Sequence, residues 1–119
     1  MTSILIIDDE NLIRRSLSRA LPKYIKSSEI FEASDGLQGQ EMWLRIKPDL
    51  VIIDVLMPEM SGPEVIRSIP VGMQTKVVMI SAHQGQIETQ TPGLKYDLFI
   101  AKPFEDIHAV AEQISKVLV

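Results

Sequence analysis

The stretch Ile4-Leu5-Ile6-Ile7-Asp8-Asp9-Glu10 places three carboxylates directly after four consecutive apolar residues. Strands that are covered on both faces of a parallel sheet are continuous apolar runs, so this run predicts a buried strand of an α/β sheet. Adjacent carboxylates repel one another unless a cation joins them, and oxygen ligands suit a hard divalent cation. The stretch therefore predicts a strand inside the sheet with a cation site at its end.

Three further apolar runs also end on polar side chains. Leu50–Ile53 leads to Asp54, Lys76–Ile80 leads to Ser81, and Asp97–Ala101 leads to Lys102. In an open parallel sheet, ligands bind beyond the carboxyl ends of the strands. These side chains are therefore expected at the same edge of the sheet as the acid pair that follows the first strand.

Helical patterns alternate with the strands and define the fold class. Helices are predicted at Asn11–Leu21, from Gly36 to about Ile46, at Pro63–Ile69 and after Lys102, with a short second strand at Glu29–Ala33. The last helix is expected to present one apolar side, formed by Phe104, Ile107, Val110, Ala111, Ile114 and Val117. Five β-α units with right-handed crossovers predict an α/β fold with a doubly wound, five-stranded parallel sheet. The length of 119 residues predicts a single domain, residues 1–119.

Composition and charge narrow the class of protein. The 45% hydrophobic content argues against disorder, and the chain has no cysteine for disulfides or thiolate metal sites. No apolar run is long enough to span a bilayer, and the start at Met1 lacks a signal-peptide pattern. The net charge of −4 argues against direct binding to nucleic acid. The expectation is a cytoplasmic domain that binds neither membrane nor nucleic acid.

Phosphoryl transfer to a carboxylate is the chemistry that fits the polar residues at the strand ends. Each of these residues also has an ordinary interpretation when it is taken alone, such as a helix cap or a solvated lysine. Asp54 is the expected nucleophile because it stands alone on a central strand, and a carboxylate can form an aspartyl phosphate. The transferring group carries charge on three oxygens, so catalysis is mainly positioning and neutralisation. Lys102 is expected to neutralise charge there, and Ser81 to donate a hydrogen bond. A divalent metal on Asp8, Asp9 and Asp54 would supply a second neutralising centre.

Four motifs at the strand ends occur together in this chain. They are Asp8-Asp9, Asp54 with Met57-Pro58 and Gly62, Ser81-Ala82, and Lys102-Pro103-Phe104. With them the sequence resembles, over essentially its whole length, the receiver domain of two-component response regulators, the CheY-like superfamily. The resemblance implies a flavodoxin-like (β/α)5 fold with strand order 2-1-3-4-5. It also implies a phosphorylatable signalling domain that assists its own phosphorylation and dephosphorylation and is not otherwise an enzyme.

The resemblance implies a phosphodonor, a cofactor and a metal site. In that family the residue matching Asp54 accepts phosphate from a phosphohistidine, so a sensor histidine kinase or a histidine phosphotransfer protein is the implied partner. Mg²⁺, or Mn²⁺, is held by the residues matching Asp9 and Asp54. The residue at Asp8 helps through water, and the backbone carbonyl of Leu56 completes the coordination.

The resemblance also implies how phosphorylation changes the domain. Ser81 and Phe99 match the family's switch pair, in which the hydroxyl moves inward on phosphorylation and the aromatic ring follows. The output surface is commonly helix four, strand five and helix five, which would contact an output domain, a downstream protein or a second copy in a homodimer. The Lys102-Pro103 peptide bond is expected to be cis, which proline permits at a cost of about 0.5–1 kcal/mol.

Two features of the chain bear on how it would switch and how long it would stay phosphorylated. The segment Gln84–Tyr96 contains Pro92-Gly93 and lacks the usual amphipathic helix, so a short or irregular helix is predicted at 84–94. Leu56 and His83, two residues after Asp54 and Ser81, flank the approach of water to the phosphoryl group. Leucine cannot orient a water, so a long-lived phosphoryl group is predicted.

Three other classes of protein share parts of this pattern. A flavodoxin needs Ser, Thr and Gly in its first loop to bind a phosphate, which Asp8-Asp9-Glu10 would repel. A haloacid-dehalogenase-type phosphatase needs a second acid where this chain has Leu56. A pseudo-receiver that acts only as a binding module stays open, and phosphorylation by a small phosphodonor would distinguish it from a receiver. The sequence also leaves open whether the chain is free-standing or part of a longer protein.

Overall fold

Five parallel strands form one sheet in the computed structural model, which describes residues 1–82 and 93–119. The strands are β1 (Thr2–Ile7), β2 (Ser28–Ala33), β3 (Leu50–Asp54), β4 (Lys76–Ser81) and β5 (Leu98–Ala101). Their order is β2-β1-β3-β4-β5, and every neighbouring pair is parallel. The predicted fold class and strand order are both confirmed.

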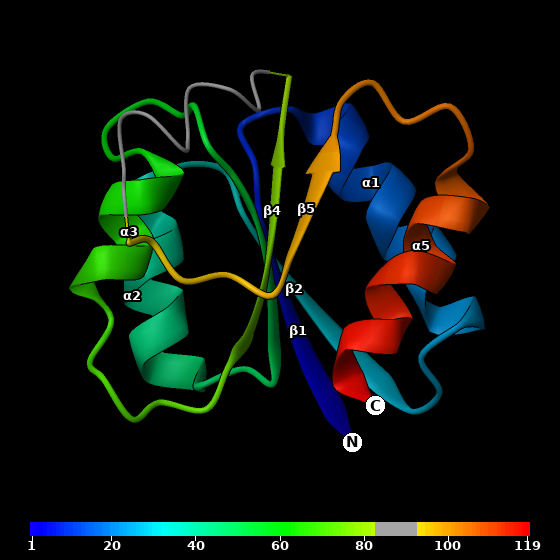
Figure 1. Cartoon of the computed structure of the whole chain (residues 1–119), viewed down its shortest axis with the longest axis horizontal. Coiled ribbons are helices and arrows are strands. Elements are labelled where there is room, and N and C mark those ends of the chain that lie inside the picture. The colour runs from blue at the N-terminus through cyan, green and yellow to red at the C-terminus, as the bar shows by residue number, and fades with distance from the viewer. Residues whose placement is uncertain (83–92) are drawn as a thin grey trace.

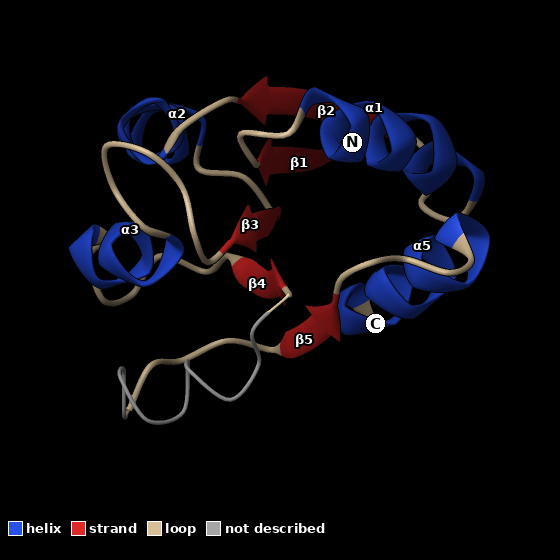
Figure 2. Cartoon of the chain, turned by 90° about the horizontal axis from the view of Figure 1, so that it is seen from above, coloured by secondary structure: helices blue, strands red, loops and turns tan. Residues whose placement is uncertain are grey.

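Helices cover both faces of this sheet (Figure 1). The helices α1 (Asn11–Ala20) and α5 (Ile107–Ser115) lie on one face, and α2 (Gly36–Ile46) and α3 (Gly62–Ser68) lie on the other. Figure 2 shows the sheet edge-on between the two pairs. The three layers are those expected of a doubly wound parallel sheet.

The central strands supply an apolar core to each face of the sheet. Ile4 and Ile6 belong to the core beneath α1 and α5, whereas Leu5 and Ile7 belong to the core beneath α2 and α3. Successive side chains of a strand point to opposite faces, so one strand serves both cores. All four of these side chains are 0% exposed, as the sequence predicts. This packed centre fixes the points at which β1 and β3 emerge from the core.

The first helix ends as its proline requires. α1 ends at Ala20, and the chain continues as a 3-10 turn, Leu21–Lys23, that contains Pro22. Proline is tolerated in the first turn of a helix, where its missing N–H needs no partner. The predicted helix Asn11–Leu21 is therefore correct to within one residue.

The last helix is shorter than its apolar pattern suggests. The Asp106 carboxylate accepts hydrogen bonds from the backbone N–H groups of His108 and Ala109, which fixes the start of α5 at Ile107. Phe104 therefore precedes the helix, and Val117 lies in the 3-10 turn Lys116–Leu118 that follows it. Both side chains still pack against the core beneath α1 and α5.

Two further predictions concern the helix expected at 84–94 and the absence of a membrane-spanning helix. Residues 84–92 of the predicted irregular helix lie outside the residues that the structure describes. Within 1–82 and 93–119, no helix has the length and apolar character that crossing a bilayer requires.

Candidate functional site

The strand ends bring the predicted site residues together at the carboxyl edge of the sheet. Asp8 follows β1, Asp54 ends β3, Ser81 ends β4 and Lys102 follows β5. The register pairs Asp54 with Ile80 and Ser81 with Ala101, so β3, β4 and β5 end at nearly the same level. A cavity of about 320 Å³ opens there, lined by Asp9, Glu10, Asp54, Leu56, Ser81, Ala82 and Lys102.

The Lys102 ammonium contacts three carboxylates at this cavity. Its Nζ lies 2.9 Å from Asp8 Oδ2, 2.9 Å from Glu10 Oε1 and 3.3 Å from Asp54 Oδ2. The Lys102 side chain is only 10% exposed, so water screens these contacts weakly. The Lys102-Pro103 peptide bond is cis, as predicted.

Asp8 is completely buried and is held through its backbone as well as its side chain. The Glu10 N–H donates a hydrogen bond to Asp8 Oδ1 at 2.8 Å, and Arg14 Nη1 donates one to the Asp8 carbonyl at 2.6 Å. The second carboxylate oxygen, Oδ2, lies 2.9 Å from the Lys102 ammonium and has no other partner within the described residues. A carboxylate oxygen has more than one lone pair, so Oδ2 can also bind an additional cation.

Burial raises the pKa values of two carboxyl groups at the cavity. It raises the pKa of Asp54 to about 6, and the charge of Asp8 adds to the effect while Lys102 opposes it. It also raises the pKa of Asp8, against the hydrogen bond from the Glu10 N–H and the contact with Lys102. For Lys102, burial lowers the pKa, but the contacts with Glu10, Asp8 and Asp54 outweigh it and raise the pKa above its ordinary value. The ammonium stays charged, and the carboxylates together carry a surplus of negative charge.

The carboxylates are spaced so that one cation could bind several of them. Oxygens of Asp8, Glu10 and Asp54 all lie within 4.8 Å of one another. This spacing and the complete burial of Asp8 fit a hard divalent cation. Asp9 lines the same cavity but is exposed and is not a member of this group. Leu56, whose carbonyl the family resemblance implies as a ligand, also lines the cavity and is 54% exposed.

Gly62 allows the loop after β3 to return to the end of that strand. Its N–H donates to the carbonyl of Val55 at 2.9 Å, and the Val55 N–H donates to the carbonyl of Ile80 at 3.1 Å. A Cβ at position 62 would overlap the backbone oxygen of Asp54. Glycine is therefore required here because the loop backbone lies directly against the residue that carries the central carboxylate.

Ser81 and Phe99, the predicted switch pair, lie on the same face of the sheet. The register pairs Met79 with Phe99, and Ser81 follows Met79 by two residues, so their side chains share a face. Ser81 is 1% exposed, whereas Phe99 is partly buried and lies edge-on to Tyr96, with 6.4 Å between the ring centroids. His83, the second residue predicted to flank the water approach, lies outside the described residues.

Glu10 and Arg14 take part in the site through contacts that the sequence did not predict. Arg14, whose side chain is 14% exposed, also contacts Glu32 at 3.0 Å and Asn11 at 3.1 Å. It therefore joins the end of β1 to β2 and to the start of α1. Two signals in the sequence pointed to these contacts. Glu10 directly follows the acid pair, and Arg14 lies three residues before the buried Leu17, which places it on the sheet-facing side of the helix.

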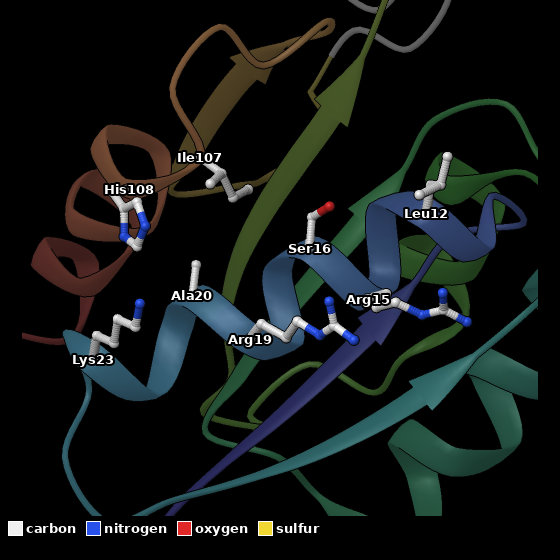
Figure 3. A pocket seen from close by; sticks show the side chains of 8 residues that line it. All are labelled: Leu12, Arg15, Ser16, Arg19, Ala20, Lys23, Ile107 and His108. Atoms are coloured by element: carbon white, nitrogen blue, oxygen red, sulfur yellow. The ribbon is translucent and has the colours of Figure 1, made fainter.

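A groove lies between α1 and α5. Figure 3 shows Ser16 and Ala20 on the side of α1 that faces Ile107 and His108 at the start of α5. The lining residues are Leu12, Arg15, Ser16, Arg19, Ala20, Lys23, Ile107 and His108, around a volume of about 320 Å³. Three of these described residues are cations and none is acidic. A hollow that includes Glu10, Ser16 and Lys102 connects this groove with the cavity.

Comparison with known protein families assigns the chain to one family. The sequence profile of the response regulator receiver domain matches residues 4–114. The chain belongs to this family. It is therefore a receiver domain of the two-component signalling systems, and the resemblance inferred from the four motifs is confirmed.

The chain covers different shares of the proteins that it resembles. The receiver domain is 34% identical to the protein CcdB of Bacillus subtilis over 122 residues, which cover 99% of this chain and 98% of CcdB. It is 35% identical to the transcriptional regulatory protein SrrA of Staphylococcus aureus over 103 residues, which cover 85% of this chain and 42% of SrrA. The chain thus spans nearly all of one relative and less than half of the other.

A solved structure confirms the family fold. The response regulator domain of Thermotoga maritima CheB superposes with a TM-score of 0.80 and 25% sequence identity, covering 99% of this chain and 93% of that one.

Proposed function

We propose that Asp54 of this receiver domain accepts a phosphoryl group from the phosphohistidine of a sensor histidine kinase or a histidine phosphotransfer protein. The observation that carries the proposal is the buried Lys102 ammonium, 3.3 Å from Asp54 and 2.9 Å from Asp8, at a cavity beyond the strand ends. A cation fixed beside a carboxylate is positioned to neutralise a phosphoryl group that becomes attached to it. Residues 1–119 would form one domain that assists its own phosphorylation and dephosphorylation.

The proposed transfer exchanges one bond to phosphorus for another. An oxygen of the Asp54 carboxylate attacks phosphorus and forms a P–O bond, while the P–N bond to the donor imidazole breaks and its electron pair stays on the nitrogen. Lys102 pairs with charge on the phosphoryl oxygens. The Ser81 hydroxyl donates a hydrogen bond to one of those oxygens.

The negative surplus at the cavity supports a divalent cofactor, Mg²⁺ or Mn²⁺. Asp8, Asp9, Asp54 and the Leu56 carbonyl are the proposed ligands. Glu10 also lies close to Asp8 and Asp54, but its carboxylate is paired with Lys102. A bound divalent cation supplies positive charge that lowers the repulsion between the carboxylates and an anionic phosphodonor.

The proposed partner surfaces lie on two sides of the cavity. A protein that delivers a phosphoryl group must rest beside the cavity, and the hollow that includes Glu10, Ser16 and Lys102 leads from the cavity to the groove between α1 and α5. The cations Arg15, Arg19 and Lys23, with apolar Leu12 and Ile107, fit a donor surface that carries acidic and apolar side chains.

Ser81 and Phe99 would pass the phosphorylated state to the face that includes β5 and α5. The proposed output partner is a domain of the same protein, a downstream protein or a second copy of the chain.

The test is chemical labelling by a small phosphodonor. Incubation with acetyl phosphate and Mg²⁺ should add one phosphoryl group by intact mass, and chelation of the metal should prevent it. Asp54→Ala should not be labelled. The matched control is Asp49→Asn, because Asp49 precedes the same strand at its opposite end and should leave labelling at the parental level. Equal labelling of Asp54→Ala would overturn the assignment.

A further inference from the structure

Glu10 makes a contact to which the proposed phosphoryl transfer assigns no role. Its carboxylate lies 2.9 Å from the Lys102 ammonium and accepts a hydrogen bond from it. The Glu10 side chain is 57% exposed, whereas the lysine side chain is 10% exposed. Glu10 thus extends from the surface to the ammonium of Lys102, which is otherwise buried.

A residue that directly precedes a helix often caps it with its side chain, but Glu10 does not. Glu10 is the N-cap residue of α1, but its side chain makes no capping hydrogen bond. Among the described residues, the Glu10 carboxylate forms its only hydrogen bond and ion pair with Lys102. Its side chain is therefore committed to the lysine and not to the helix.

Of the three carboxylates on Lys102, Glu10 is the one that can leave. Asp8 is completely buried and receives the Glu10 N–H at 2.8 Å, so separating it from its cation would leave an unpaired buried charge. Asp54 is the proposed phosphoacceptor and stays at the reacting centre. Glu10 can return to water, because more than half of its side chain is already exposed.

We propose that Glu10 is a positioning residue that holds the Lys102 ammonium in the resting site and competes with the incoming phosphoryl group for it. The inference rests on the proposed function, since Lys102 must exchange a carboxylate for a phosphoryl oxygen during the transfer. The contact to Glu10 has to break before that exchange is complete, so it slows phosphorylation of Asp54. An exposed carboxylate at the cavity mouth also repels the anionic donor, and the test must separate this effect from the contact.

Three substitutions separate the contact from the charge. Glu10→Gln removes the charge and weakens the contact. Glu10→Asp keeps the charge but is one methylene shorter, so it no longer reaches the ammonium. Glu105→Gln is the matched control, because Glu105 is exposed, lies three residues after Lys102 and makes no ion pair within the described residues. Full-length chains are compared at saturating Mg²⁺ with acetyl phosphate, and the labelling rate is followed by intact mass.

Both substitutions at Glu10 are expected to raise the labelling rate about threefold or more, because each frees the ammonium for the phosphoryl group. Glu105→Gln should remain at the parental rate. Exchange of the Lys102 ammonium hydrogens, followed by NMR spectroscopy without donor, should become faster in both Glu10 variants. Calorimetric titration should give a Mg²⁺ dissociation constant for Glu10→Gln within about twofold of the parental value, because the proposed ligands remain.

Four results would overturn the inference. A parental or lower labelling rate in Glu10→Gln would show that the contact does not slow the transfer. A parental rate in Glu10→Asp, with a raised rate in Glu10→Gln, would assign the effect to charge alone. A large loss of Mg²⁺ affinity in Glu10→Gln would make Glu10 a metal ligand instead. Absence of labelling in the parental chain would overturn the proposed function itself, and this inference with it, whereas the first three results leave that function intact.

Discussion

At the scale of single residues, the cavity combines one fixed ammonium with an excess of carboxylates. Lys102 contacts Asp8, Glu10 and Asp54, and Asp9 lines the same space. The excess attracts a divalent cation and repels an anionic donor until that cation is bound. Leu56 adds apolar surface at this otherwise charged cavity.

Leu56→Asn is expected to shorten the life of a phosphoryl group on Asp54. An asparagine amide can orient a water toward phosphorus, whereas the exposed leucine covers the approach with apolar surface. The dephosphorylation rate should rise about threefold or more, and the phosphorylation rate should change less, because a hydrogen bond to water is gained only in hydrolysis. Intact mass after removal of the donor measures both forms.

The matched control for this prediction is Leu37→Asn. Leu37 is 51% exposed, close to the 54% of Leu56, but it lies on α2 and does not line the cavity. Its variant should lose phosphate at the parental rate. If Leu56→Asn also decays at that rate, water access past residue 56 does not determine the lifetime.

At the scale of elements, the sequence could predict the strands better than the last helix. Continuous apolar runs placed the end of β3 at Asp54 and the start of β5 within one residue of Leu98. The apolar pattern could not give the bounds of α5, because Phe104 and Val117 extend it beyond both ends of the helix. The bounds depend instead on capping by the Asp106 side chain, which a periodicity of apolar residues does not report.

Gly62→Ala is expected to destabilise the domain more than loss of the neighbouring cap does. A Cβ at position 62 would overlap the backbone oxygen of Asp54, so β3 or the loop must shift, at a cost of about 3 kcal/mol. Ser61→Ala removes only the side chain that caps α3 by accepting from the Glu64 N–H, worth about 1 kcal/mol. Urea denaturation measures both.

Labelling by acetyl phosphate shows whether the shift reaches the site. The Gly62→Ala variant should be labelled more slowly than the parental chain, since the shift would move the Asp54 backbone. Ser61→Ala should be labelled at the parental rate. A Gly62→Ala variant as stable as Ser61→Ala would show that the loop can move away from Asp54 at no more than the cost of the lost cap.

At the scale of the whole molecule, the sheet explains which parts of the site could be predicted. Alternating strands and helices predict a parallel sheet, and parallel strands bring their carboxyl ends to one edge. This rule is sufficient to predict that Asp8, Asp54, Ser81 and Lys102 lie together. The strand order came from the family resemblance, because alternation alone does not fix it. The Glu10–Lys102 contact joins residues 92 positions apart, and its geometry depends on where α1 begins.

The stability of the whole domain should depend on pH through the buried carboxylates, and Asp54→Asn should reveal it. The folded-state pKa of Asp54 is raised from 3.8 to about 6. Between these values the folded domain keeps a proton that the unfolded chain has released, so stability falls as pH rises through this window. Without metal near neutral pH, Asp54→Asn should therefore raise the free energy of unfolding by on the order of 2 kcal/mol, less any loss of the Lys102 contact.

The difference should shrink as the pH is lowered through the window and nearly vanish below its lower end, where Asp54 is protonated in both states. Saturating Mg²⁺ should stabilise the parental domain near neutral pH, because the ion relieves the repulsion between the Asp54 carboxylate and its acidic neighbours. It should stabilise the Asp54→Asn variant less, because that variant lacks the Asp54 charge. Glu105→Gln, an exposed control, should change stability by no more than about 0.5 kcal/mol. A pH-independent gain in Asp54→Asn would show that packing, not charge, is responsible. The raised pKa of Lys102 keeps the ammonium charged throughout this range, so Lys102 itself does not contribute to the pH dependence.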